Sequence, residues 1–424
     1  MGAFSLLNVQ SHMVNIAMHS RAMEEFLKSD SKYDIIIQTY AFNEAYLGLA
    51  HHFDARVIGF IPFSTMPQIL SLTGNSAPYS YVPLPFLGYT DNMSFLQRTM
   101  NAVVGLFIHL LHDFYLLPKQ EEILKERFPD FPPIKQIQNE RVDLIFSNAH
   151  FSNESPRPKT PNIVYIGGYH VQEPEPLTPD VQKILDSSSE GVVFLAFGTN
   201  VDVSKLRKEK MDAFLNTFSK IPYRVLLKYK GVLPDKPKNV ETVDWVPQRG
   251  VLAHPNVKIF ISHGGKGSAT ESLYYGVPVL CVSFFADQMK NCEDIADYNY
   301  GIHLPFQDVT KESFEKAFNE LNTNPKYKEN AKYRSSLFKE QEMDPLERAI
   351  FWIEHIHKFK GAKHLRPKSA TMPLYQYLLL DVWAFIAGSL MVFLFIVYKI
   401  SKFVIRRLCR SSRKEKTEEK IKRQ

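Results

Sequence analysis

The sequence predicts an α/β protein with two Rossmann-like domains, the first incomplete, followed by one C-terminal transmembrane helix. Three observations support this fold class. Apolar runs of strand length alternate with helical patterns, which is typical of parallel sheets covered by helices. A stretch rich in proline, 171–179, separates two such regions and indicates a linker. An apolar run of 20 residues near the end is followed at once by a basic tail.

Before the linker, the apolar pattern is that of a partial α/β unit. We expect strands at 33–38, 57–61 and 142–147, and helices at 45–52 and 95–117. Pro, Gly and Ser dominate 71–89, which predicts an irregular loop. Aromatic residues in the second helix, such as Phe95, Phe107 and Phe114, suit either a pocket for an apolar ligand or a plain core.

After the linker, strand and helix patterns alternate regularly. We expect strands at 192–197, 224–229, 241–245, 258–262 and 279–282, and a late helix at 345–360. The resulting organisation has six parts: a truncated N-terminal domain at 1–170, a linker at 171–190, a second domain at 191–345, a helical return and juxtamembrane segment at 346–377, a transmembrane helix at 378–398 and a basic tail at 399–424.

The net charge of +6 belongs to the tail rather than to the folded body. From residue 399 onward the chain carries eleven Lys or Arg against three Glu. The remainder is therefore slightly acidic. A nucleic-acid binder needs its basic residues on a folded face, so nucleic acid is not expected as a partner.

The apolar run from Leu378 to Val397 is long enough to span a bilayer core of roughly 30 Å. The positive-inside rule places the basic tail in the cytosol and the body on the luminal side. Residues 1–10 lack a basic start and a long apolar stretch, so they do not read as a signal peptide. Two glycosylation sequons, at Asn92 and Asn153, fit a luminal body.

The chain has three cysteines, Cys281, Cys292 and Cys409. Their spacing does not fit a zinc site, and no metal is expected. Cys281 and Cys292 could pair in an oxidising compartment, but we expect separate free thiols. Cys409 follows basic residues beyond the apolar run, where palmitoylation is conceivable and a plain tail residue is the simpler interpretation.

The segment from Trp245 to Gln288 carries the chemistry. An expected strand ends in His263-Gly264-Gly265, and a helix follows near Ser268. Glycines at such a turn let a ligand approach the backbone. The free N–H groups and the positive end of the helix dipole then suit a diphosphate.

Further polar and aromatic groups surround this turn in the sequence. Glu271 is expected on the first helical turn, where it could accept hydrogen bonds from ribose hydroxyls. Trp245 offers a flat face for a base. Asp287 and Gln288 follow the next strand and could bind sugar hydroxyls. All of these residues follow parallel strands, whose carboxyl ends form the usual ligand-binding edge.

Taken together, these 44 residues resemble the donor-binding signature of the animal UDP-glycosyltransferase (UDP-glucuronosyltransferase) family, with its opening WxPQ and closing DQ. The resemblance continues in 194–200 and 345–366 and covers roughly residues 33–424. It implies a GT-B fold and an inverting, metal-independent transfer from UDP-glucuronate or UDP-glucose to a small lipophilic hydroxyl compound. The UDP-sugar is a co-substrate, and no cofactor is expected.

The resemblance also implies which residues bind the donor. Trp245 would stack on uracil, Gln248 would bond the uridine, Thr199, His263 and Ser268 would hold the diphosphate at the Gly264-Gly265 turn, Glu271 would bind the ribose, and Asp287 and Gln288 the sugar. One departure is Gly267, where the family often has Asn. The tail residues Lys420 and Lys422 resemble a KxKxx signal for retrieval to the endoplasmic reticulum.

A second departure concerns catalysis. In the family, a His in the first loop of the N-terminal domain removes the acceptor proton, and an acid after the strand at 33–38 orients it. The acid position matches Thr39, which has no carboxylate, and the base would lie upstream of the strand. The histidines in this half are His12, His19, His51, His52, His109, His112 and His150. Only His12 loosely resembles the family loop, so the catalytic residues stay unassigned.

Three interpretations follow. The chain is a single-pass type I membrane transferase of the endoplasmic reticulum, and so a glycoprotein that takes part in detoxification. Alternatively, it is a form that binds UDP-sugar, or pairs as a homo- or hetero-oligomer, without turnover. The third interpretation is an incomplete gene model, in which case the real protein has an intact N-terminus.

Overall fold

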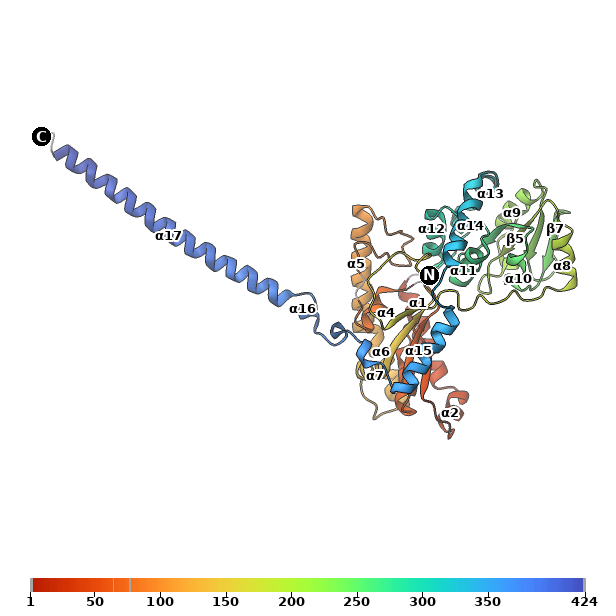
Figure 1. The fold of residues 1–424 in the computed structure, drawn as a ribbon, viewed down its shortest axis with the longest axis horizontal. Coiled ribbons are helices and arrows are strands. Elements are labelled where there is room, and N and C mark those ends of the chain that lie inside the picture. The colour runs from red at the N-terminus through yellow and green to blue at the C-terminus, as the bar shows by residue number, and fades with distance from the viewer. Residues whose placement is uncertain (1–2, 64, 76–77, 422–424) are drawn as a thin grey trace. The chain divides into compact units, whose positions relative to one another are not determined.

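A computed structural model describes residues 3–63, 65–75 and 78–421 of the chain. It divides into two compact units, Met1–Ala370 and Thr371–Gln424. The first unit contains two separate parallel sheets, each with its own helices (Figure 1). Each sheet has its own buried apolar cluster.

The first sheet has four parallel strands in the order β1-β2-β3-β4. Their bounds are Ile35–Thr39 (β1), Arg56–Ile61 (β2), Val142–Ser147 (β3) and Ile163–Tyr165 (β4). The helical elements of this half are α1 (Ala3–Met18), α2 (Arg21–Leu27), η1 (Glu44–Tyr46), α3 (Leu47–His52), α4 (Pro67–Leu72), α5 (Phe95–Leu111), the π-helix η2 (His112–Leu116), α6 (Leu117–Arg127) and α7 (Ile134–Arg141). Every residue of β3 is buried, as expected for a strand covered on both faces.

The second sheet has six parallel strands in the order β10-β9-β8-β5-β6-β7. Their bounds are Val192–Ala196 (β5), Arg224–Lys228 (β6), Val240–Val243 (β7), Val257–Ser262 (β8), Val279–Cys281 (β9) and Gly301–His303 (β10). The chain runs outward from β5 to β7, then returns to the other side of β5 to form β8. The strand order therefore reverses between β5 and β8, which is where doubly wound sheets bind ligands.

Helices cover this sheet and connect it to the rest of the first unit. They are α8 (Pro179–Asp186), η3 (Val203–Lys205), α9 (Lys208–Phe218), α10 (Gln248–Ala253), α11 (Lys266–Tyr275), α12 (Gln288–Asp297), η4 (Phe306–Asp308), α13 (Lys311–Thr323) and α14 (Pro325–Lys339). The next helix, α15 (Pro345–Phe359), returns to the first sheet, where Ala349 and Ile356 pack against Ile58 and Leu144. The short turns η5 (Lys363–Leu365) and η6 (Lys368–Ala370) complete this unit.

The second unit consists of α16 (Leu374–Tyr377) and the 42-residue helix α17 (Leu380–Ile421). Its stretch Leu380–Arg407 is long and apolar enough to cross a membrane, and none of its most apolar window is buried. At 1.5 Å per residue, these 28 residues span about 42 Å, more than the roughly 30 Å of a bilayer core.

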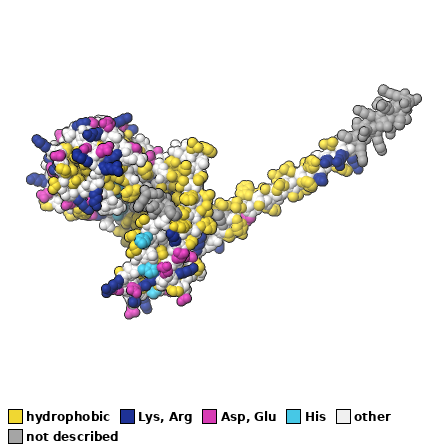
Figure 2. Space-filling model, turned by 180° about the vertical axis from the view of Figure 1, so that it is seen from behind, with side chains coloured by type: hydrophobic (Ala, Val, Ile, Leu, Met, Phe, Trp, Pro, Cys, Tyr) yellow, Lys and Arg dark blue, Asp and Glu magenta, His cyan; other side chains and the backbone are white. Residues whose placement is uncertain are grey.

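The continuous helical stretch Phe95–Arg127 passes the same length and composition test, but it is partly buried in the first unit. On the inner side of α5, Asn101, Gly105 and Ile108 are buried. Of the two alternatives for Phe95, Phe107 and Phe114, the plain core is excluded, since their side chains are 72%, 59% and 78% exposed. Figure 2 shows hydrophobic side chains gathered on the surface of the body.

Candidate functional site

The carboxyl ends of the second sheet gather most of the residues singled out in the sequence. Thr199 follows β5, Trp245 follows β7, His263 follows β8 and Asp287 follows β9. Because all six strands are parallel, these positions lie along one edge of the sheet. Thr199 and His263 flank the point where the strand order reverses.

The turn after β8 is shaped around the imidazole of His263. Gly264 has a φ of +79° and Gly198 a φ of +70°, conformations that L side chains rarely adopt. A Cβ at Gly198 would lie 2.7 Å from His263 Cε1, and a Cβ at Gly265 only 2.5 Å from His263 Nε2. The ring is therefore held between two glycines, at the N-terminus of α11.

His263 is neutral at physiological pH. Burial, together with the charge of Lys228, lowers its pKa to about 4. Its Nδ1 atom is buried and has no hydrogen-bond partner among the described residues. A neutral imidazole keeps one N–H donor, so His263 can donate to an anionic oxygen while it adds no charge to the site.

An open cleft of about 440 Å³ begins at the turn after β5. It is lined by Phe197, Gly198, Thr199, Val201, Asp202, Val203, Lys228, Tyr229, Lys230, Asp244 and Trp245. Trp245 is 65% exposed, so a ring face is open to stacking. Lys228, which the sequence reasoning missed, donates from Nζ to the carbonyl of Gly198 at 3.0 Å. Its position at the end of β6 could have indicated that it lies on the ligand-binding edge of the sheet.

On α10 and α11, three predicted residues bond to one another. Nε2 of Gln248 donates to Ser268 Oγ at 2.9 Å and to Glu271 Oε2 at 2.5 Å. The helix begins at Lys266, so Glu271 lies on the second turn, one turn later than expected. Burial raises the pKa of the Glu271 carboxyl. These side chains form one connected polar group beside the glycine turn.

The linker contacts this group, which the sequence did not reveal. Nε2 of His170 lies 4.0 Å from Glu271 Oε1. Arg249, next to Gln248, donates to the His170 carbonyl at 2.8 Å and pairs with Glu175. His170, just before the linker, therefore approaches the second turn of α11, and His170 and Glu175 both contact the first turn of α10.

Asp287 and Gln288 lie at the start of α12. Gln288 is buried, and its Oε1 accepts from the backbone N–H groups of Phe284 and Phe285 at 2.9 and 3.2 Å. This leaves the Nε2 end of Gln288 as the part that could meet a ligand. Asn291 donates to Asp287 Oδ2 at 3.0 Å and to the Gly264 carbonyl at 2.8 Å, which connects α12 to the glycine turn.

The expectation of free thiols at Cys281 and Cys292 is wrong, because the two residues form a disulfide with a Cα–Cα distance of 5.5 Å. Both are fully buried. They meet because α12 packs along β9 and β10, which brings the second turn of α12 to the end of β9. The two cysteines are 11 positions apart in the sequence, a spacing that does not indicate this contact.

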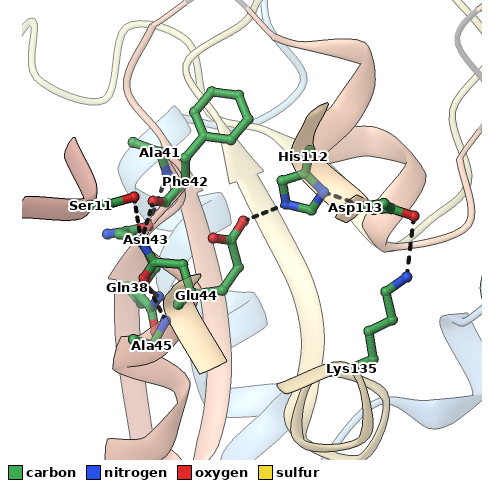
Figure 3. A network of polar contacts seen from close by, with 11 residues as sticks. Ser11, Gln38, Ala41, Phe42, Asn43, Glu44, Ala45, His112, Asp113 and Lys135 are labelled. Carbon is green, nitrogen blue, oxygen red and sulfur yellow. Dashed lines mark hydrogen bonds and ion pairs between the residues drawn. The ribbon is translucent and has the colours of Figure 1, made fainter. Parts of the chain in front are cut away.

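In the first half, Figure 3 shows a buried network around His112 on the π-helix η2. Its Nε2 lies 3.1 Å from Glu44 Oε1, and its Nδ1 lies 2.9 Å from Asp113 Oδ1. Lys135 donates to the other oxygen of Asp113 at 3.2 Å. Glu44 belongs to η1, which follows β1, so the network joins the end of β1 to the helix α5-η2-α6.

Burial on its own would lower the pKa of His112, but hydrogen bonds to Asp113 and Glu44 and their negative charges raise it to about 9. The ring is thus an imidazolium at neutral pH and cannot accept a proton there. His12 is exposed on α1, and Thr39 is the last residue of β1. None of His112, His12 and Thr39 is arranged as a catalytic base, and no residue is assigned to that role.

The two parallel-sheet halves, with the polar edge of the second at its switch point, define a GT-B glycosyltransferase. Solved structures with this fold align over most of the chain. CalG4, the calicheamicin glycosyltransferase, matches with a TM-score of 0.55 and 17% identity over 85% of each chain. A UDP-glucose: anthocyanidin 3-O-glucosyltransferase in complex with UDP matches with a TM-score of 0.53 and 18% identity over 80% of this chain and 78% of that one.

The family model for UDP-glucoronosyl and UDP-glucosyl transferase matches residues 6–415. UDP-glycosyltransferase UGT5 of Dactylopius coccus is 36% identical over 91% of this chain and 74% of its own length. UDP-glucuronosyltransferase 2C1 of Oryctolagus cuniculus is 32% identical over 82% of this chain and 69% of its own. The chain belongs to this family and is a UDP-sugar-dependent glycosyltransferase.

Proposed function

We propose that this protein transfers glucuronate or glucose from its UDP carrier to a hydroxyl of a small lipophilic acceptor, with inversion and without a metal. The observation that carries the proposal is the neutral His263, held between Gly198 and Gly265 at the N-terminus of α11. A diphosphate fits this point, because glycines, free helix N–H groups and an uncharged hydrogen-bond donor meet at the N-terminus of α11.

Residues along the same edge of the second sheet supply the remaining contacts to the UDP-sugar. Trp245 stacks on uracil and Gln248 bonds the uridine, while Glu271 accepts from the ribose. Thr199 and Ser268 join His263 on the diphosphate. Asp287 and the amide of Gln288 bind the sugar. Binding would require Gln248 to exchange its bonds to Ser268 and Glu271 for bonds to the nucleotide.

In the reaction, the acceptor oxygen attacks the anomeric carbon as the bond from that carbon to the UDP oxygen breaks. Negative charge grows on the departing diphosphate. The N–H groups at the start of α11, the imidazole of His263 and the ammonium of Lys228 are placed to stabilise it. A general base must take the acceptor proton.

A second candidate function is a form that binds UDP-sugar, alone or as an oligomer partner, without turnover. Two observations favour it. The acid position of the family is Thr39, which has no carboxylate. The buried His112 is already paired through both ring nitrogens with Glu44 and Asp113, so it cannot replace the base.

We also propose a single-pass placement in the endoplasmic reticulum membrane, with the body luminal and the tail cytosolic. Support comes from α17, whose apolar part is followed by basic residues. A buried disulfide adds support, because disulfides persist in oxidising compartments. The KxKxx resemblance lies at residues 420–424, most of which fall outside the described residues.

One experiment separates the two functions. Residues 1–424 are expressed in microsomes, and both UDP-sugar binding and transfer to a phenolic acceptor are measured. A transferase gives saturable binding and a glycosylated product. Binding without product above background would leave only the binding form, and the absence of binding would reject both functions.

A further inference from the structure

The Cys281–Cys292 disulfide lies directly behind the glycine turn of the donor site. A Cβ added to Gly264 would stand 2.4 Å from Cys292 Sγ and 2.7 Å from Cys281 Sγ. Cys292 Sγ is also 4.0 Å from the His263 carbonyl. The backbone of Gly264 therefore rests on the two sulfur atoms, with no space for even one more carbon.

The bridge joins two elements of the donor edge and contacts a third. Cys281 is the last residue of β9, and Cys292 lies in the second turn of α12. Between them runs the loop that carries Asp287 and Gln288. Asn291, adjacent to Cys292, holds the Gly264 carbonyl at 2.8 Å. The disulfide thus lies where the β8 turn, the end of β9 and the start of α12 converge.

We propose that this disulfide is a positioning element for diphosphate binding: it sets the position of the Gly264 backbone and so the aim of His263 and of the first N–H groups of α11. The proposal rests on the proposed donor site. It adds that the affinity for the diphosphate depends on the oxidation state of two cysteines that touch no substrate.

The physical reason is packing. Two unbonded sulfur atoms keep a van der Waals separation, roughly 3.5–4 Å, whereas a disulfide holds them at about 2 Å. Both side chains are fully buried, and Gly264 closes one side of the space around them. Since protein interiors are close-packed, separated thiols must displace a neighbour. The Gly264 backbone is one such neighbour, since it leaves no space for an added carbon beside either sulfur atom.

The redox step balances as thiol–disulfide exchange. Two thiols of the chain lose two protons and two electrons, and a disulfide oxidant such as glutathione disulfide is reduced to two thiols. A dithiol reductant reverses the reaction. Because both sulfurs are buried, reduction requires local opening of α12 or of the glycine turn.

The test uses the full chain, purified from secretory membranes in detergent, and two probes. UDP reports on the diphosphate contacts, whereas uridine lacks both phosphates and reports only on the base and ribose contacts. Each affinity is measured by calorimetry before and after reduction with a phosphine. We expect reduction to weaken UDP binding about tenfold, the scale of one lost hydrogen bond to a charged group, and to leave uridine binding unchanged.

Two variants provide controls. In Cys281→Ala/Cys292→Ala the reductant should change neither affinity, and in Cys409→Ser the UDP effect should persist. Equal UDP affinity in the oxidised and reduced chain would overturn the proposal, as would parallel losses of UDP and uridine, which indicate general unfolding. Mass spectrometry that finds free thiols at 281 and 292 before reduction would also overturn it. An oxidised chain that binds neither probe would instead reject the donor site itself.

Discussion

At the scale of single residues, the glycines around His263 are not equivalent. Gly198 and Gly265 hold the imidazole on its two sides, and a side chain at either would collide with it. Gly267, two positions beyond Gly265, is different. A Cβ there meets only His170 Nε2 at 3.9 Å, an ordinary contact, so position 267 has room for a side chain.

The pair Gly267→Asn and Gly265→Asn tests this difference. The Gly267→Asn substitution should add a side-chain donor at the helix N-terminus and remove the helix cost of glycine, so UDP affinity should rise by about threefold to tenfold. The Gly265→Asn substitution should displace the imidazole of His263 and weaken UDP binding by more than about tenfold. Calorimetry with UDP measures both. Equal effects of the two substitutions would contradict the packing around His263.

Single residues also show how far sequence could predict the site. His263, Gly264 and Trp245 could be proposed from the sequence because they lie at or just after the ends of expected strands and form an ordered set. Lys228, His170 and Asn291 were missed, because their relevance depends on which strand ends become neighbours. The disulfide was misjudged for the same reason: the contact between α12 and β9 is a tertiary fact that spacing does not encode.

At the scale of elements, the π-helix η2 and the network around His112 connect α5 and α6 to the end of β1. The His112 side chain is 3% exposed and has a pKa of about 9, compared with 6.5 for a free histidine. The protonated His112 ring therefore makes its full contribution to the free energy of unfolding below pH 6.5. This contribution is lost as the pH rises through about 9. The shift corresponds to at most on the order of 3 kcal/mol.

We therefore expect the melting temperature of the detergent-solubilised chain to fall between about pH 7 and about pH 9.5, and part of that fall should vanish in His112→Met. His12→Met, at an exposed position on α1, is the matched control and should keep the full pH dependence. The buried ion network would be refuted if wild type and His112→Met lost the same stability over this range.

The elements themselves were largely predictable. Each of the eight expected strands is present, with bounds that differ by at most two residues, because buried parallel strands read as short apolar runs. The strands β4 and β10, with three residues each, were not predicted. The helix expected at 95–117 continues through η2 into α6, where polar residues outnumber apolar ones.

At the scale of the whole molecule, the two glycosylation sequons differ in exposure. Asn92 is exposed. Asn153 is only 9% exposed, and its Oδ1 accepts from the backbone N–H of His150 at 3.0 Å. In a luminal body, Asn92 is therefore the site that a glycan can occupy in the folded chain.

We predict one endoglycosidase-sensitive glycan on the chain expressed in animal cells. Asn92→Gln should abolish the mobility shift on a denaturing gel, whereas Asn153→Gln should leave it. A chain that carries no glycan, while a co-expressed luminal reporter is glycosylated, would argue against the luminal placement of the body.

In the proposed complex, uridine stacks on Trp245 at the edge of the second sheet. The chain has three tryptophans, so Trp352→Phe/Trp383→Phe leaves Trp245 as the sole indole fluorophore. Its fluorescence is titrated with UDP while calorimetry follows binding. If uridine stacks on Trp245, UDP should quench its fluorescence saturably, with the same dissociation constant as the calorimetric isotherm. Calorimetric binding of UDP with unchanged Trp245 fluorescence, or no binding at all, would contradict it.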